Sequence, residues 1–518
     1  MRKVSIPSRS AAGGAGNSAG ELQKTQDFTS RTLVALAAGL SLCAYLVINV
    51  HPPTNDDWST ILAVYQGRGH LLRLAFGPYF HHWHPLFWVG PSLASVMDAN
   101  DYAILPIRAL NCFGFFLSLC ALGAIARMLA ARRWGMIAGM VLFTFHQSTV
   151  GVLRQWDSFG QIWGDALARW MLVALLVAWN GRSARWLRGP WGAFVVCIVS
   201  FVGLTGTERV LATVMGSVTM MVVILAVAKW NESRASTSSA GKSPTTGRTR
   251  DFLWPLGGVF GATIAFLVVR WLVGATADAG GRYTYATPIQ LVRNVIEMAY
   301  GVLTPISTLV AFNWWITGNH LWLGLSVAVT VGGGGCLAVA LFRTRHETGG
   351  RVAALLLACF AACFPLAFVS HVSEHYLAAP AFFFSLLFMI ALGPKTFRVQ
   401  GSRYLAQLGV ALYLLLHVHG FVTKELAAEE TGKRDLRDGR ALFSQLRDLP
   451  SDTTIGFVAD VGAPSYYSCY TTPTGFDVLV LEGSRVGKRW SVVPGALTDL
   501  TIHLTRDGLL VVRMASEK

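Results

Sequence analysis

Charged residues are scarce in this sequence of 518 residues, because Asp, Glu, Lys and Arg together make up only 14% of it. Hydrophobic residues make up 53%, and the mean hydropathy is +0.47. A soluble globular protein has about 25% charged residues. The low charge and the long apolar runs therefore exclude an ordinary soluble domain and predict a polytopic membrane protein.

Acidic residues are scarcer than basic ones, with 28 Asp and Glu against 43 Lys and Arg. This imbalance does not predict nucleic-acid binding, because the basic residues gather in short links between apolar runs and not on one amphipathic face. Cysteine is also rare, and the 8 cysteines are scattered without a CxxC pair. Their spacing predicts neither a disulfide framework nor a cysteine metal site.

About eleven apolar segments are long enough to cross roughly 30 Å of hydrocarbon. They lie near residues 31–50, 103–126, 135–152, 160–179, 191–207, 210–229, 252–274, 320–342, 351–370, 376–393 and 403–421. The basic links fall on the same side as the basic N-terminal tail, which the positive-inside rule places in the cytoplasm. We therefore expect a multi-pass protein of the plasma (inner) membrane with a cytoplasmic N-terminus and an extracytoplasmic C-terminal domain.

The segments between the spans complete the expected membrane domain, residues 31–421. A disordered cytoplasmic tail (1–30) precedes it, and the first outer loop covers residues 51–102. The Ser/Thr/Gly-rich segment 230–251 predicts a flexible cytoplasmic linker. Residues 296–316 are apolar but contain Pro305, and we expect a re-entrant or interfacial helix there.

The last part of the chain, residues 422–518, has the pattern of a small α+β domain. It begins with a polar helix that ends at Pro450. The runs that follow are TTIGFVAD, FDVLVLEG, RWSVV and DLTIHLTRDGLLVVRM. Their alternating or Val-rich composition, bounded by Gly, Pro and Asp, predicts strands.

The outer ends of the expected spans carry unusual polar clusters. These clusters contain Asp56, Asp57, Trp83, His84, Glu208, Arg209, Glu374 and His375. Carboxylates at a membrane boundary are costly to desolvate. Several of them at the same face therefore predict a shared polar cavity.

Each cluster also has a purely structural explanation. Asp56 and Asp57 precede the helical pattern WSTILAVY and could cap a helix N-terminus. Glu208 could form an interfacial ion pair with its neighbour Arg209. The three histidines within 81–84 lack a fixed ligand spacing, so we expect interface residues beside a tryptophan and no metal site.

The motifs NDDWSTI, HHWHPLFWV, ILPIRALNCFGFFLSL, TGTERVLATV and VSEHYLAAPAFFF, taken in order, resemble the GT-C superfamily of membrane glycosyltransferases over residues 31–393. They are most similar to its family 39-like branch, which includes protein O-mannosyltransferases and the TPR-linked O-mannosyltransferases. The resemblance implies an α-helical GT-C fold and a polyprenyl-phosphate sugar as donor. It also implies transfer to a protein or glycan acceptor on the extracytoplasmic side, with no cofactor besides the lipid-linked donor.

The resemblance implies roles for single residues. Asp56 matches the first acid of the family's acidic pair and is the expected general base, because a carboxylate is ionised at neutral pH and can accept the acceptor's hydroxyl proton. Asp57 and Glu208 are expected to hold Asp56 or the acceptor in place. The expected substrate-binding residues are Trp83, His84, Arg209, Arg282, Glu374 and His375.

The chain departs from the family pattern where the family carries cations. His84 stands in place of Arg, Thr207 in place of Lys, and His375 in place of Arg. A cation should neutralise the donor phosphate, and histidine does so only when it is protonated. The expected substitutes are Arg209, Arg282, Arg293 and protonated His84 and His375.

Two other functions fit parts of the sequence. A polymerase or ligase of cell-envelope polysaccharide would use a diphosphate-linked glycan as its donor. A transporter would place its substrate groups near mid-bilayer, often at broken helices of an inverted repeat. Here the acids lie at the outer boundary of the spans, and no internal repeat is visible.

Overall fold

The structure is a computed structural model that describes most of the chain. The described residues are 15–48, 56–66, 71–77, 83–97, 104–155, 158–180, 185–236, 246–275, 286–369, 373–392, 400–460, 476–495, 500–506 and 510–514.

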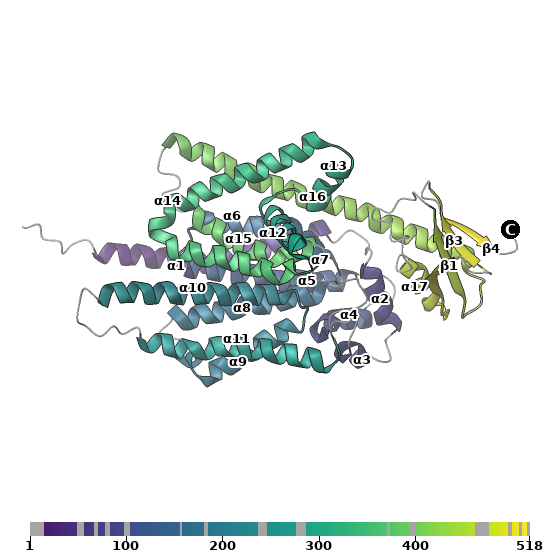
Figure 1. Ribbon diagram of the computed structural model, residues 1–518, viewed down its shortest axis with the longest axis horizontal. Coiled ribbons are helices and arrows are strands. Elements are labelled where there is room, and N and C mark those ends of the chain that lie inside the picture. Colours follow the sequence, from purple (N-terminus) through teal and green to yellow (C-terminus); the bar gives the residue numbers. More distant parts are fainter. Residues whose placement is uncertain are drawn as a thin grey trace, which may run out of the picture.

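A bundle of long apolar helices forms the membrane domain (Figure 1). Its helices are α1 (Ala15–Ile48), α5 (Ile104–Met128), α6 (Arg133–Thr144), α7 (Gln147–Arg154), α8 (Phe159–Asn180), α9 (Pro190–Leu204), α10 (Val210–Ser236), α11 (Thr246–Leu272), α14 (His320–Ala367), α15 (Ala378–Ala391) and α16 (Gln400–Leu446). Within the described residues, nine segments are long and apolar enough to cross a membrane, and the bent pair α6–α7 makes ten. The expected helical membrane fold is confirmed.

Every expected span coincides with helix, although not always with one whole helix. Two spans, His320–Arg343 and Gly349–Ala367, belong to the single helix α14. The span expected at 135–152 is divided between α6 and α7, which meet at 56°. The span expected at 191–207 is α9, which is apolar but only 15 residues long.

The two ends of the bundle differ in what they carry. The short helices α2 (Asp56–Gln66), α3 (Leu71–Phe76) and α4 (Pro85–Met97) lie at the end next to the C-terminal domain, which we call the domain end (Figure 1). At the opposite end α1 enters, α10 ends and α11 begins, and we call this the linker end (Figure 1). The two ends of the bundle are therefore structurally distinct.

The segment expected to be re-entrant or interfacial forms two short helices. They are α12 (Pro288–Leu303) and α13 (Thr308–Ile316), and the break between them contains Pro305. Neither helix is among the candidate spans. α12 begins eight residues before the expected start of this segment, where Thr287 and Gln290 form a reciprocal capping box.

α15 is the central helix of the bundle, and all its residues from Ala378 to Ala391 are buried. Its close contact with α6 depends on small residues, because a Cβ atom at Gly135 or Gly139 would lie 2.3 Å from Met389. Small residues allow such close backbone approach between membrane helices. The 3-10 helix η3 (Glu374–Leu377) runs directly into α15 and is thereby held at a fixed place.

Helices extend further than the sequence indicated at both polar segments of the linker end. α1 begins at Ala15, inside the tail 1–30, and α10 and α11 reach Ser236 and Thr246, inside the segment 230–251. Propagating an existing helix adds one hydrogen bond per residue without a new nucleation cost. Helices that are stable in the membrane therefore continue into their polar flanks, and residues 237–245 lie outside the described residues.

The C-terminal domain is a four-stranded sheet packed on helices. Its elements are β1 (Thr454–Ala459), α17 (Asp477–Arg485), β2 (Ser491–Pro494), β3 (Leu500–Leu504) and β4 (Leu510–Met514). The strand order is β2-β1-β3-β4, with β1 parallel to β2 and β3, and β3 antiparallel to β4. The expected polar helix is the end of α16, which runs without a break from the membrane domain.

The strand expected at FDVLVLEG was wrong, because these residues form α17. A parallel connection such as β1 to β2 requires a crossover, usually a helix. The apolar run is also buried on two sides. Leu479 packs in the core of the sheet, while Val478 and Leu481 pack against Trp58 and Ile61 of α2. The C-terminal domain thus contacts the helix that begins with the acidic pair.

Candidate active site

The acidic pair opens α2, because Asp56 and Asp57 are its first two helical residues. Acidic side chains are favoured there by the helix dipole. The side chain of Asp57 is fully buried, and it lies within electrostatic range of Arg108 on α5. The side chain of Asp56 lies outside the described residues.

Arg108, which lies on α5, links Asp57 to three further helices, α1, α7 and α16. Its Nη1 atom donates a hydrogen bond to the carbonyl of Ile48 (2.9 Å), and its Nε atom donates to the carbonyl of Arg154 (3.4 Å). It also lies within electrostatic range of Glu425 on α16. A buried guanidinium with several partners restricts how these segments can move relative to one another.

Glu208 lies in the turn between α9 and α10 and has two cationic neighbours. Its carboxylate interacts with Nε2 of His84 and with Nη1 of Arg270, the latter at 3.1 Å. The same turn is joined to the start of α4, because the backbone N–H of Leu86 donates to the carbonyl of Thr205 (3.1 Å). His84 and Glu208, which belong to two separate clusters in the sequence, thus lie in contact, and Arg270, which the sequence analysis did not name, joins them.

Arg209 points to a different set of residues from Glu208. Its Nη1 atom donates a hydrogen bond to Oε1 of Gln161 (3.2 Å), and its guanidinium lies over the ring of Tyr376 at 5.4 Å. Gln161 in turn donates from Nε2 to the carbonyl of His375 (3.0 Å). This chain of contacts links the turn that carries Glu208 to η3.

Glu374 opens η3 and is held by three donors. Its carboxylate accepts hydrogen bonds from the hydroxyls of Ser307 (2.5 Å) and Thr308 (2.9 Å) and from the ammonium of Lys424. Lys424 on α16 also donates to the carbonyl of Gln147 (2.9 Å). A buried carboxylate with this many partners is well compensated for its loss of water.

His375 lies among more cations than acids. Arg154, Arg209, Lys424 and Glu374 all act on it electrostatically. Its ring fills the space over Gly151, where a Cβ atom would lie 2.3 Å from Cε1 of the histidine. Glu425 also acts on Arg154 and Lys424, so three cations face two carboxylates in a part of the site that is largely shielded from water.

Arg154, at the end of α7, was missed by the sequence analysis. The residue is only 8% exposed, and its Nε and Nη1 atoms have no hydrogen-bond partner among the described residues. A buried guanidinium is costly to leave unpaired. The sequence did contain a signal, because Arg154 and Lys424 each follow a span on the side that is predicted to be non-cytoplasmic, against the charge bias of the other links.

The remaining residues that the sequence analysis named do not take part in the contacts described above. Trp83 is 6% exposed and packs between Phe201 of α9 and Phe266 of α11, with ring centroids 6.3 and 6.1 Å away. Arg293 is exposed on α12 and pairs with Glu297. Arg282 lies outside the described residues.

Exposed tryptophans indicate how deep in the membrane the candidate site lies. Those near the linker end are Trp134, Trp186, Trp191, Trp230 and Trp254, and those near the domain end are Trp271, Trp315 and Trp322, whereas Trp170 lies midway along α8. Tryptophan is enriched at membrane interfaces. Arg209 and Trp230 are separated by about 30 Å along α10 at 1.5 Å per residue, which matches the hydrocarbon thickness. The polar residues therefore lie near one membrane boundary.

Solved structures share this architecture. ArnT from Cupriavidus metallidurans, solved with undecaprenyl phosphate bound, matches with a TM-score of 0.50 and 12% identity over 91% of this chain and 92% of ArnT. The fold is that of the GT-C membrane glycosyltransferases. Arabinofuranosyltransferase AftD from mycobacteria (TM-score 0.46, 14% identity, 90% of this chain and 32% of AftD) also matches. So does the oligosaccharyltransferase from Archaeoglobus fulgidus (TM-score 0.45, 12% identity, 89% of this chain and 62% of that protein).

The low sequence identities and the partial coverage mean that these similarities support only a shared fold. This chain spans about a third of the length of AftD, and no compared structure exceeds 15% identity. No family model and no curated protein matches the sequence. The fold gathers the described polar residues toward the domain end of the bundle, and their catalytic roles remain predictions.

Proposed function

We propose that this chain transfers a sugar from a polyprenyl-phosphate-linked donor to an acceptor hydroxyl on the extracytoplasmic side. The observation that carries the proposal is the excess of cations around His375, at the same end of the bundle as the acidic pair. Arg154, Arg209 and Lys424 suit an anionic phosphate group. The ArnT structure holds undecaprenyl phosphate, and the shared fold supports the same class of lipid here.

In the proposed reaction, the acceptor oxygen attacks the anomeric carbon of the sugar while the bond from that carbon to the phosphate oxygen breaks. Asp56 accepts the hydroxyl proton as general base. The polyprenyl phosphate leaves with the electron pair of the broken bond, and the cations stabilise the negative charge that develops. Attack opposite the leaving group inverts the configuration at the anomeric carbon, as in the family 39-like branch that the motifs resemble.

The remaining acids have positioning roles in this proposal. Glu208 is held by His84 and Arg270, so it can accept a hydrogen bond from the sugar or the acceptor at a fixed place. Glu374 holds Lys424 toward the site. The donor carries its own leaving group, and the proposed reaction uses no cofactor. Arg282, together with Trp83, stays a predicted substrate contact.

The function is tested through the lipid-linked sugar. In cells that lack the protein, mass spectrometry of extracted lipids should show one polyprenyl-phosphate sugar accumulating. The wild-type chain should restore its normal level, and the Asp56→Asn variant should not, because an amide cannot act as the base. Asp438→Asn, at a half-buried carboxylate of α16 that pairs with Arg437, is the matched control and should restore it. Full restoration by Asp56→Asn would remove Asp56 from this role.

A further inference from the structure

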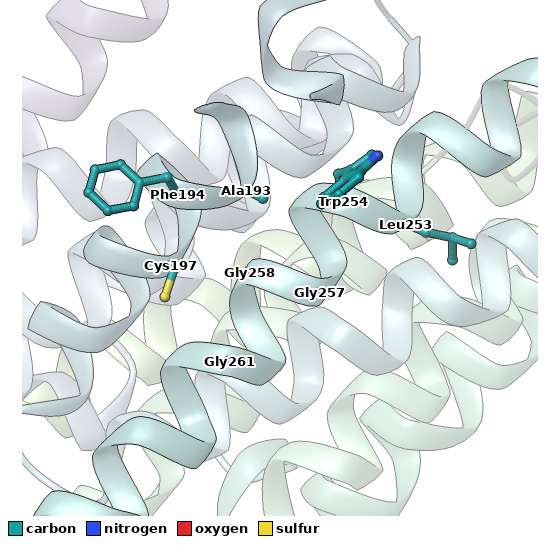
Figure 2. Close-up of a pocket in the computed structure, with 8 residues that line it drawn as sticks. All are labelled: Ala193, Phe194, Cys197, Leu253, Trp254, Gly257, Gly258 and Gly261. Carbon is teal, nitrogen blue, oxygen red and sulfur yellow. The ribbon is translucent and has the colours of Figure 1, made fainter. Parts of the chain in front are cut away.

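A groove on the surface of the bundle runs between α9 and α11 near the linker end (Figure 2). Its volume is about 590 Å³, and it is lined by Ala193, Phe194, Cys197, Leu253, Trp254, Gly257, Gly258 and Gly261. No charged side chain lines it. The groove is open along much of its surface and does not enclose a ligand on all sides.

Three glycines of α11 create the groove in two different ways. A Cβ atom at Gly258 would lie 2.3 Å from the carbonyl oxygen of Ala193, so this glycine allows α9 and α11 to touch. Gly257 and Gly261 have no atom within 4 Å of their Cβ positions. They are four residues apart and thus share one face of the helix. Their missing side chains leave the groove open.

The position of the groove on the bundle indicates which part of the membrane it faces. Both helices are apolar and begin at the linker end, and Leu253 and Trp254 are exposed at the start of the candidate span in α11. The groove therefore opens into the hydrocarbon of the leaflet at the linker end. The lining suits a hydrocarbon chain, because apolar side chains and helix backbone form most of it and the indole N–H of Trp254 and the thiol of Cys197 are its only polar side-chain groups.

The same two helices lead from the groove to the candidate active site. Arg270 at the far end of α11 pairs with Glu208, which follows α9. Gly257 and Arg270 are separated by about 20 Å along α11 at 1.5 Å per residue. Exposed apolar side chains of α11 cover this distance, namely Phe260, Ile264, Leu267, Val268 and Trp271. The groove and the site are thus joined by a continuous apolar surface.

We propose that the groove between α9 and α11 binds the distal part of the donor's polyprenyl chain. This inference rests on the proposed function, which places the donor phosphate near Arg209 at the domain end. An ordinary acyl chain anchored there spans only its own leaflet, about 15 Å of hydrocarbon, and stops short of the groove. A polyprenyl chain is long enough to continue into the opposite leaflet. The groove would then select donors by the length of their lipid.

Binding of prenyl phosphates of different length tests the proposal without any sugar transfer. Purified full-length protein in nanodiscs should bind undecaprenyl phosphate at least about tenfold more tightly than farnesyl phosphate, because each buried CH₂ adds to affinity. The Gly257→Leu/Gly261→Leu variant, which fills the groove, should lose this preference while its affinity for farnesyl phosphate stays the same. The matched control is Gly335→Leu on α14, a glycine that also has no atom within 4 Å of its Cβ position.

A second variant keeps the test valid if the Gly257→Leu/Gly261→Leu protein does not fold. Phe194→Ala removes one wall without adding volume, and it should also lower the affinity for undecaprenyl phosphate alone. The proposal is overturned if the wild type shows no chain-length preference, if the filled variant keeps it, or if the affinities for both prenyl phosphates fall together.

Photoreactive lipids identify the occupant. A diazirine near the distal end of undecaprenyl phosphate should label residues of α9 and α11, and a phospholipid with a diazirine at its acyl end should not compete with it. Labelling by the phospholipid alone would overturn the proposal and assign the groove to a bilayer lipid. Chain-length-selective binding without sugar transfer would instead contradict the proposed function and leave the groove assignment standing.

Discussion

At the scale of the residue, the site combines acids that lie in turns or at helix starts with cations that lie within helices or next to their ends. The sequence motifs identified Glu208, His84 and Glu374, because each is a polar residue in an otherwise apolar neighbourhood. They did not identify Arg154, which follows a span without a recognisable motif. The Nε and Nη1 atoms of Arg154 have no hydrogen-bond partner in the part of the chain that the structure describes, which makes this residue the strongest candidate for direct contact with an anionic donor group.

Removal of that cation should weaken donor binding. Arg154→Gln should raise the KM for the lipid-linked donor by about ten- to a hundredfold, because a hydrogen bond to a charged group contributes roughly 1.5–3 kcal/mol. Steady-state kinetics at varied donor concentration provide the measurement. Arg293→Gln, at an exposed arginine paired with Glu297, is the control and should leave the KM unchanged. An unchanged KM in Arg154→Gln would assign the phosphate to Arg209 and Lys424.

The sequence could place the acids but not their partners. Asp56 and Asp57 lie at the start of a helix, as helix-capping logic predicts, yet only the fold shows that Asp57 faces Arg108. Pairs such as Lys424 with Glu374 or Arg270 with Glu208 join residues more than 45 positions apart. Hydropathy patterns carry no information on such contacts, because they depend on how the helices pack.

At the scale of the element, close packing of helices sets the position of the turn that carries Glu208. Gly160 of α8 and Gly206 of this turn touch through their backbones. A Cβ atom at Gly160 would lie 2.2 Å from the carbonyl oxygen of Gly206, and one at Gly206 would lie 2.1 Å from the carbonyl oxygen of Gly160. Neither carbonyl belongs to a flexible side chain, so the turn itself must move if either glycine is replaced.

Gly160→Ala should therefore reduce sugar transfer. The added methyl group pushes the turn and Glu208 away from α8, and a displacement of about 1 Å in an active site can cost roughly a hundredfold in rate. The rate of transfer and the melting temperature should be measured together. Gly189→Ala is the control, because no atom lies within 4 Å of that Cβ position. A normal rate in Gly160→Ala would show that the position of the turn is not critical.

Sequence patterns were most reliable for long apolar helices and least reliable for the short apolar run of α17. A run of four apolar residues, such as Val478 to Leu481, suits a buried strand and a doubly buried helix equally well. Its helical state is decided by two partners distant in sequence, the sheet of the C-terminal domain and Trp58 of α2. The join between α16 and the polar helix was missed because the helix pattern changes from apolar to charged there without a break.

At the scale of the whole molecule, the direction of the bundle in the membrane determines which side the site faces. Basic links and the positive-inside rule predict that the linker end is cytoplasmic and the domain end is extracytoplasmic. Both ends carry exposed side chains that can be replaced by cysteine, Trp134 near the linker end and Val486 in the C-terminal domain.

Cysteine labelling in intact cells measures this orientation. In a variant whose native cysteines are replaced by alanine, Val486→Cys should react with a membrane-impermeant maleimide in intact cells. Trp134→Cys should react only after the cells are permeabilised. The reverse pattern would place the site in the cytoplasm and contradict transfer on the extracytoplasmic side.

One continuous helix spans both parts of the molecule. α16 extends for 47 residues, about 70 Å at 1.5 Å per residue, from the linker end into the core of the C-terminal domain. Lys424 and Glu425 lie partway along it, where they face Glu374 and Arg108. We expect the helix to act as a lever: an acceptor that tilts the C-terminal domain should also shift this charged midpoint, so that docking on the domain should alter the proposed site of sugar transfer.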